Sequence, residues 1–168
     1  MIFLLTYPIE GVIETVEWLR ANNIKIGSTT GYTKEMMAVV VPEAKKKGYA
    51  PDHLVTPTDL GNLGRPYPYM VFENMRQLQL SHVKQVVKVG DTASDIKEAL
   101  HAGVWAVGVI IGSSEMGVSE EEFKQLSSEQ QQQLIEQTRA KFEAYGAHYT
   151  IDTMQQLPQI LAEIEANL

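Results

Sequence analysis

The sequence predicts an α/β fold built on a doubly wound parallel sheet. Its 168 residues fit one domain that can bury a sizeable core. Four or five short apolar stretches alternate with helical stretches, which is typical of parallel strands joined by helices. The clearest unit is the β-branched stretch 85–89, which leads through Asp91 into a helix at 96–100.

The first half of the chain supplies two further strands. The apolar stretch 1–7 stops at Pro8, and we expect a strand or a disordered leader there, because it is too short for a membrane span and lacks the cationic start of a signal peptide. The other expected elements are a helix with an apolar stripe at 12–19, a strand at 24–27, a turn at 28–33, a helix at 34–47, a strand at 53–56, a loop at 58–64 and a helix at 69–80. Pro42 should break or kink the helix at 34–47 near Val41, or start a second helix.

The second half completes the sheet. The expected elements are a strand at 104–111, a flexible loop at 112–117, a helix opened by a capping box at Ser119, a solvated helix at 129–145, a strand at 147–151 and a closing helix whose apolar face runs from Met154 to Ile164. We therefore predict one domain over 1–168, of which 1–8 is a leader.

Composition excludes several functions. A net charge of −7 without a basic run argues against nucleic acid or an anionic membrane as the main partner. Because the chain has no cysteine, a disulfide framework, a thiolate nucleophile and a zinc knuckle are excluded. The cytoplasm is the default location.

Asp91 and Asp95 form a candidate magnesium site. Both follow a strand tip, where open α/β sheets bind ligands. At ~5 Å and an effective dielectric of about 20, two carboxylates repel each other by roughly 3 kcal/mol, and a divalent cation removes that cost. Oxygen ligands with room for water and a phosphoryl group suit magnesium. The alternative is that Asp91 only ends the strand and Asp95 only favours the helix dipole. Lys88 lies within the strand, where alternation predicts that it points away from the neighbours of Asp91 and is structural.

Two other strand ends carry candidate phosphate ligands. The turn at 28–33 is rich in hydroxyls around Gly31, so that backbone N–H groups and side chains could donate to an anion, although such residues also cap helices. Arg65 stands between Gly64 and Pro66 on a stiff backbone, and its guanidinium suits phosphate; a surface arginine is the alternative.

The order and spacing of Ser28-Thr29-Thr30-Gly31, Gly64-Arg65-Pro66 and Gly90-Asp91-Thr92-Ala93-Ser94-Asp95 resemble three motifs of the haloacid dehalogenase superfamily. The amino-acid sequences of segments 26–33, 64–68 and 107–115 are similar to those of its phosphonatase family. The resemblance extends from about Gly11 to the C-terminus. The resemblance implies a Rossmann-like core, a small phosphonate substrate and Mg²⁺ as cofactor. It also implies hydrolysis of the carbon–phosphorus bond of phosphonoacetaldehyde to acetaldehyde and phosphate, and it leaves a homodimer open.

The resemblance also implies roles for individual residues. Asp91 matches the magnesium ligand, and Asp95 matches the carboxylate that supports it. Arg65 and Thr30 match residues that bind and neutralise the phosphoryl group. The remaining residues expected to line the substrate pocket are Ser28, Thr29, Gly31 and Tyr32.

Two parts of the family pattern have no match. The nucleophilic aspartate of the first strand and the Schiff-base lysine of the helical cap are expected in segments that no stretch of this sequence resembles. Because that first strand is central, a gap between two strands should result, and residues 2–6 are a candidate surrogate strand. The isolated chain is expected to be inactive. The alternatives are a non-catalytic module that binds magnesium and phosphate, and a related phosphatase that acts on phosphate esters.

Overall fold

The computed structural model describes residues 9–168. The leader 1–8 and the surrogate strand predicted at 2–6 lie outside this range. The described strands are β1 (Gly27–Thr29), β2 (His53–Val55), β3 (Val87–Gly90), β4 (Trp105–Val109) and β5 (Tyr149–Ile151). Every pair that bonds is parallel, as predicted.

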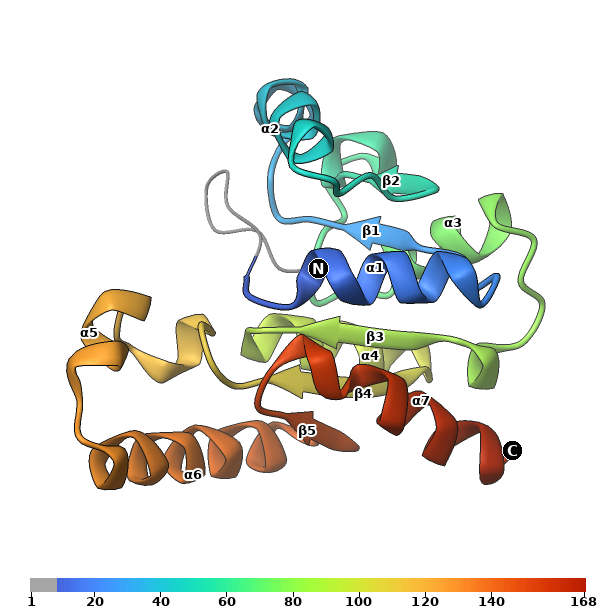
Figure 1. Cartoon of the computed structure of the whole chain (residues 1–168). Coiled ribbons are helices and arrows are strands. Elements are labelled where there is room, and N and C mark those ends of the chain that lie inside the picture. Colours follow the sequence, from blue (N-terminus) through green and yellow to red (C-terminus); the bar gives the residue numbers. More distant parts are fainter. Residues whose placement is uncertain (1–8) are drawn as a thin grey trace.

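The sheet is split in two between β1 and β3. Over residues 9–168, β1 pairs with β2, and β3, β4 and β5 form a separate sheet in that order. β1 and β3 point the same way beside each other without pairing (Figure 1). The predicted gap between two strands is therefore confirmed for the described part of the chain.

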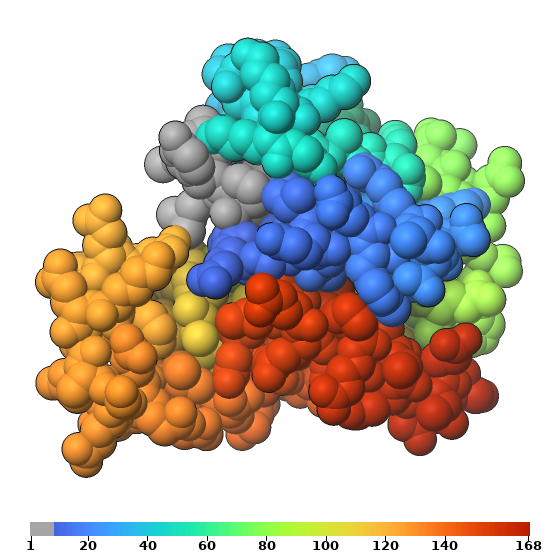
Figure 2. Space-filling view, in the orientation of Figure 1, coloured from blue at the N-terminus to red at the C-terminus, as the bar shows by residue number. Residues whose placement is uncertain are grey.

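Helices cover both faces of this split sheet. Helices α1 (Val12–Ala21) and α7 (Leu157–Ala166) lie on one face, where they contact each other (Figure 2). Helices α3 (Tyr69–Gln77), α4 (Ala93–Ala102) and α6 (Ser128–Tyr145) cover the other face. Among residues 9–168 no helix combines the length and the apolar composition needed to span a membrane.

Side-chain alternation along β4 explains the two layers. Val107 and Val109 belong to the core beneath α1 and α7, whereas Ala106 belongs to the core beneath α4 and α6. Gly108 faces α6 so closely that a Cβ atom there would lie 2.7 Å from the ring of Phe142. An apolar strand with both faces buried is what a doubly wound sheet requires.

Two sequence expectations were wrong in detail. The strand expected at 24–27 is β1 at Gly27–Thr29, so Ser28 and Thr29 belong to the strand instead of to a turn. Helix α2 (Lys34–Lys46) continues through Pro42 without the break expected there, because the loss of one N–H donor does not offset the rest of a well-capped helix; the alternative of a kink stays a prediction. The capping box at Ser119 is confirmed at the start of the short helix α5 (Glu120–Gln125).

Candidate active site

The residues singled out from the sequence gather at the ends of β1 and β3. Thr29 ends β1 and Thr30 follows it, while Gly90 ends β3 and Asp91 follows it. Since the two strands point the same way, these ends lie at one edge of the fold (Figure 1). Arg65 reaches the same region from the loop before α3 and donates through Nη2 to the carbonyl oxygen of Thr29 over 2.9 Å.

Asp95 is the anchor of helix α4. Its Oδ2 accepts hydrogen bonds from the Thr92 hydroxyl (2.7 Å) and from the backbone N–H groups of Thr92 (3.2 Å) and Asp91 (3.3 Å). Its Oδ1 lies 3.0 Å from Arg65 Nη1 and 3.1 Å from Lys88 Nζ. Burial raises the pKa of this carboxyl, whereas nearby positive charge, including Lys88 and Arg65, and the hydrogen bond from the Thr92 hydroxyl lower it; the net effect holds the pKa well below its ordinary value. Asp95 is therefore an ionised, buried carboxylate that is hydrogen-bonded through Oδ2 and paired with two cations through Oδ1.

A second buried carboxylate, Glu98, completes a four-charge cluster with Asp95, Arg65 and Lys88. Glu98 Oε2 lies 2.9 Å from Lys88 Nζ and 3.2 Å from Arg65 Nε, and it accepts a hydrogen bond from the Thr29 hydroxyl over 2.9 Å. Both carboxylates are fully buried. The cluster links β1 to β3 and α4 across the gap in the sheet.

The predicted direction of the Lys88 side chain was wrong, because it points to the face covered by α4, where Asp95 and Glu98 lie. That Lys88 is structural stays a prediction. Sequence reasoning missed Glu98 altogether. Its spacing of three residues from Asp95 puts both carboxylates on one face of α4, and that signal could have found it.

Asp91 bonds to this cluster through its backbone N–H, while its carboxylate binds a different loop and remains partly accessible. Its Oδ2 accepts from the hydroxyl of Ser114 (3.2 Å) and from the Ser114 backbone N–H (3.4 Å). The loop that carries Ser114 is held by Glu115, whose carboxylate accepts from the N–H of Ala93 (3.0 Å) and the hydroxyl of Tyr145 (2.8 Å). The flexible loop expected at 112–117 is thus tied to both α4 and α6 beside Asp91.

The turn after β1 offers donors near the gap. The Thr30 hydroxyl accepts from the N–H of Tyr32 over 3.1 Å, which shapes a tight turn around Gly31. A Cβ atom on Gly31 would meet no protein atom within 4 Å, so packing inside the described chain does not require glycine there. Open space beside a turn of hydroxyl residues is what close approach of an anion would need.

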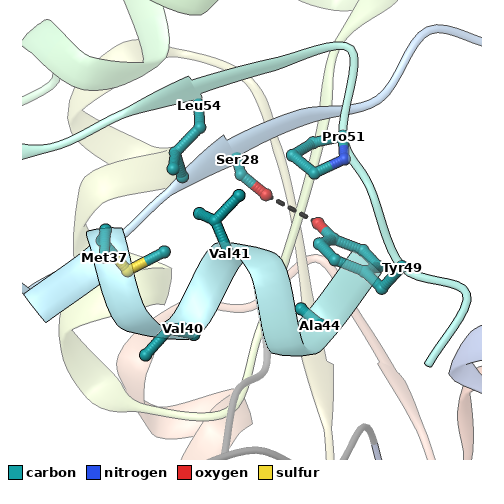
Figure 3. A pocket seen from close by; sticks show the side chains of 8 residues that line it. All are labelled: Ser28, Met37, Val40, Val41, Ala44, Tyr49, Pro51 and Leu54. Carbon is teal, nitrogen blue, oxygen red and sulfur yellow. Dashed lines mark hydrogen bonds between the residues drawn. The ribbon is translucent and has the colours of Figure 1, made fainter. Parts of the chain in front are cut away.

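Ser28 is not brought to this site. Its hydroxyl shares a 2.6 Å hydrogen bond with the Tyr49 hydroxyl on the opposite face of β1, in a small apolar pocket beneath α2 (Figure 3). The pocket is lined by Ser28, Met37, Val40, Val41, Ala44, Tyr49, Pro51 and Leu54. The substrate contact expected of Ser28 stays a prediction that this geometry does not support.

The donor set fits magnesium through Asp91 only. Asp95 cannot turn to a metal without abandoning three hydrogen bonds and two cations. Within residues 9–168 there is no group of three or more histidine, cysteine, aspartate or glutamate side chains that could hold a metal ion. Magnesium tolerates such a sparse site, because it takes one or two carboxylates and fills its shell with water and substrate oxygens.

Comparison with known proteins defines the class. The family model described as haloacid dehalogenase-like hydrolase matches residues 1–103, which is more than half of the chain. This chain therefore belongs to the haloacid dehalogenase-like hydrolase family.

Proteins in that family that are similar to this chain carry more specific names. The chain is 62% identical over 163 residues to the phosphonoacetaldehyde hydrolase of Lysinibacillus sphaericus, covering 97% of this chain and 61% of that protein. It is 51% identical over 160 residues to a bifunctional phosphonoacetaldehyde hydrolase/aminoethylphosphonate transaminase of Clostridioides difficile, covering 95% of this chain and 25% of that protein. A crystal structure of a phosphonoacetaldehyde hydrolase-like protein from Oleispira antarctica superimposes with a TM-score of 0.91 at 36% identity, covering 96% of this chain and 58% of that one. The chain thus spans about 60% or less of these proteins.

Proposed function

We propose that this chain is the part of a phosphonoacetaldehyde hydrolase that binds the phosphoryl group of the substrate and the magnesium ion. Such an enzyme cleaves the carbon–phosphorus bond of phosphonoacetaldehyde to give acetaldehyde and phosphate. One observation carries the proposal. Arg65 contacts Thr29 at the end of β1 and Asp95 on α4, and Asp91 follows the end of β3, in a chain that is 62% identical to a curated phosphonoacetaldehyde hydrolase.

The chain's own residues would bind and orient the phosphonate. Arg65, the side chain of the cluster nearest to solvent, would neutralise its charge, and Thr30 and the backbone around Gly31 would donate to its oxygens. Magnesium held by Asp91 would supply further positive charge to the same oxygens when bound. Such groups stabilise developing charge more strongly in a dry site than in water.

Cleavage requires groups that have no match in this sequence. The nucleophilic carboxylate and the Schiff-base lysine of the family are both expected elsewhere. Lys88 is no substitute for that lysine, because it is buried with its Nζ against Glu98 and Asp95. We expect a further segment to enter between β1 and β3 and to bring the nucleophile beside Asp91.

A second candidate is a module that binds magnesium and phosphate without turnover. It is favoured by the sparse metal site, in which Asp91 is the one carboxylate of the described Asp91–Asp95 pair that is open to a metal. A phosphatase that acts on phosphate esters needs no Schiff-base lysine, but it needs the same missing nucleophile.

The test measures acetaldehyde and phosphate released from phosphonoacetaldehyde with magnesium. We would assay the chain alone and the chain mixed with the segment of the Lysinibacillus protein that it does not match, beside Asp91→Asn in each case. We expect no release by the chain alone, release by the mixture, and none with Asp91→Asn. Phosphate binding without release in either case would select the binding module, and release from phosphate esters alone would select the phosphatase.

A further inference from the structure

Two cations in the buried cluster hold the same three oxygen atoms. Lys88 Nζ lies 2.7 Å from Thr29 Oγ1, 3.1 Å from Asp95 Oδ1 and 2.9 Å from Glu98 Oε2. The Arg65 guanidinium reaches those same atoms over 3.2, 3.0 and 3.2 Å through Nη2, Nη1 and Nε. Each oxygen is therefore contacted twice.

Lys88 alone offers as many donors as this set has oxygens. An ammonium group has three N–H donors and no acceptor; Lys88 donates to Thr29 Oγ1 and lies within ion-pair distance of Asp95 Oδ1 and Glu98 Oε2. Arg65 duplicates these three contacts, with longer distances to Thr29 Oγ1 and Glu98 Oε2, and in addition donates to the carbonyl oxygen of Thr29.

Arg65 is also the member of the cluster nearest to solvent. Its side chain is 15% exposed, against 8% for Lys88 and 0% for Asp95 and Glu98. It comes from a loop, whereas the other three are fixed on β3 and α4. Of the two cations, Arg65 is thus the one whose side chain can turn toward solvent while β3 and α4 stay in place.

We infer that Lys88 is a positioning residue that keeps the buried carboxylates paired while Arg65 turns to a phosphoryl group. This rests on the proposed function, in which Arg65 binds that group. Removing one partner of a buried ion pair is strongly unfavourable because it leaves an uncompensated charge. Without Lys88, Arg65 could bind an anion only by leaving Asp95 and Glu98 with no cation at all. With Lys88 in place, one positive charge stays beside both carboxylates when Arg65 leaves, so the cluster keeps one uncompensated negative charge instead of two and the penalty is smaller.

The first experiment titrates inorganic phosphate with magnesium into the wild-type chain, Lys88→Met, Lys88→Arg and Lys88→Met/Glu98→Gln. We expect Lys88→Met to weaken phosphate binding by about tenfold or more although Arg65 is intact, since Arg65 is then held by the carboxylates. Lys88→Arg should bind like the wild type. The double variant should recover most of the loss, because only one buried carboxylate remains. Equal affinity of Lys88→Met and wild type would overturn the inference, as would a double variant as weak as Lys88→Met.

The second experiment does not depend on phosphate. The hydrogen-exchange rate of Arg65 Nε–H, followed by nuclear magnetic resonance, reports how readily that group leaves Glu98. Exchange should slow several-fold in Lys88→Met and quicken in Glu98→Gln. Wild-type rates in both variants would contradict the sharing of oxygens.

If the wild-type chain bound no phosphate, the proposed function would fail while the exchange rates still decided the role of Lys88. If Lys88→Met did not fold, Glu98→Gln alone would decide: it should exchange faster and bind phosphate no more weakly than the wild type.

Discussion

Gly90 and Asp95 approach each other so closely that no side chain fits between them. A Cβ atom on Gly90 would lie 2.1 Å from Cβ and 2.5 Å from Cγ of Asp95. The first turn of α4 therefore rests directly on the backbone of the last residue of β3. This contact lets Asp95 bond back to the N–H of Asp91 while it reaches Arg65 and Lys88.

Gly90→Ala should accordingly destabilise the fold. The added methyl must push α4 away from β3 and stretch the contacts of Asp95, and we expect a loss of about 2–3 kcal/mol in the free energy of unfolding. Urea denaturation measures it. Gly31→Ala is the matched control, because a methyl there meets open space, and its stability should stay within about 0.5 kcal/mol of the wild type. Equal stability of the two variants would contradict the close packing.

Acid should weaken the protein through Asp95. Because the folded pKa of Asp95 is depressed, the stability it contributes is present above its unfolded pKa of about 3.9 and is lost as the pH falls through the lower folded value. The difference in unfolding free energy between wild type and Asp95→Asn should therefore be largest above about pH 4 and shrink below it.

The measurement is chemical denaturation at several pH values between neutral and strongly acidic. Glu73→Gln serves as the control. The pKa of Glu73 is also lowered, to about 2, chiefly by its hydrogen bond to Arg76, but this pair is on the surface and screened by solvent. The unfolding free energy of Glu73→Gln should change with pH on the acid side as that of the wild type does. A pH-independent difference for Asp95→Asn would show that the carboxyl does not titrate as the cluster implies.

Tyr145→Phe should loosen the loop beside Asp91. The variant removes the hydroxyl that holds Glu115, and with it one of the two anchors of that carboxylate, at a cost of about 1–2 kcal/mol for a hydrogen bond to a charged group. The backbone N–H of Ala93, which donates a hydrogen bond to the Glu115 carboxylate, should then exchange faster with solvent. Amide exchange followed by nuclear magnetic resonance measures this. Unchanged protection of Ala93 would mean that Glu115 needs no support from α6.

The sequence predicted the architecture well because its signals are local. Apolar stretches mark the strands, and the capping box at Ser119 marks a helix start that the structure contains. What it could not predict is which face each side chain takes when the strand itself is misplaced. β1 begins three residues later than expected and so includes Ser28 and Thr29, which alternate: Thr29 faces the cluster and Ser28 faces Tyr49. The pairing of Lys88 with Glu98 was missed for a related reason, because it depends on which face of β3 the helix α4 covers.

The split of the hydroxyl residues at the end of β1 gives the last prediction. Ser28 points into the apolar pocket under α2 (Figure 3). Thr30 instead belongs to the turn that follows β1. Ser28→Ala should therefore leave the affinity for inorganic phosphate unchanged while costing about 1 kcal/mol of stability through the lost bond to Tyr49. Thr30→Val should weaken phosphate binding about tenfold, as expected for one lost hydrogen bond to a charged group. Thr30→Ser, which keeps the hydroxyl, separates this effect from a change in the turn and should bind like the wild type. If Ser28→Ala weakened binding as much as Thr30→Val, the serine would have to leave Tyr49 and turn through the strand, and the assignment of the two faces of β1 would be wrong.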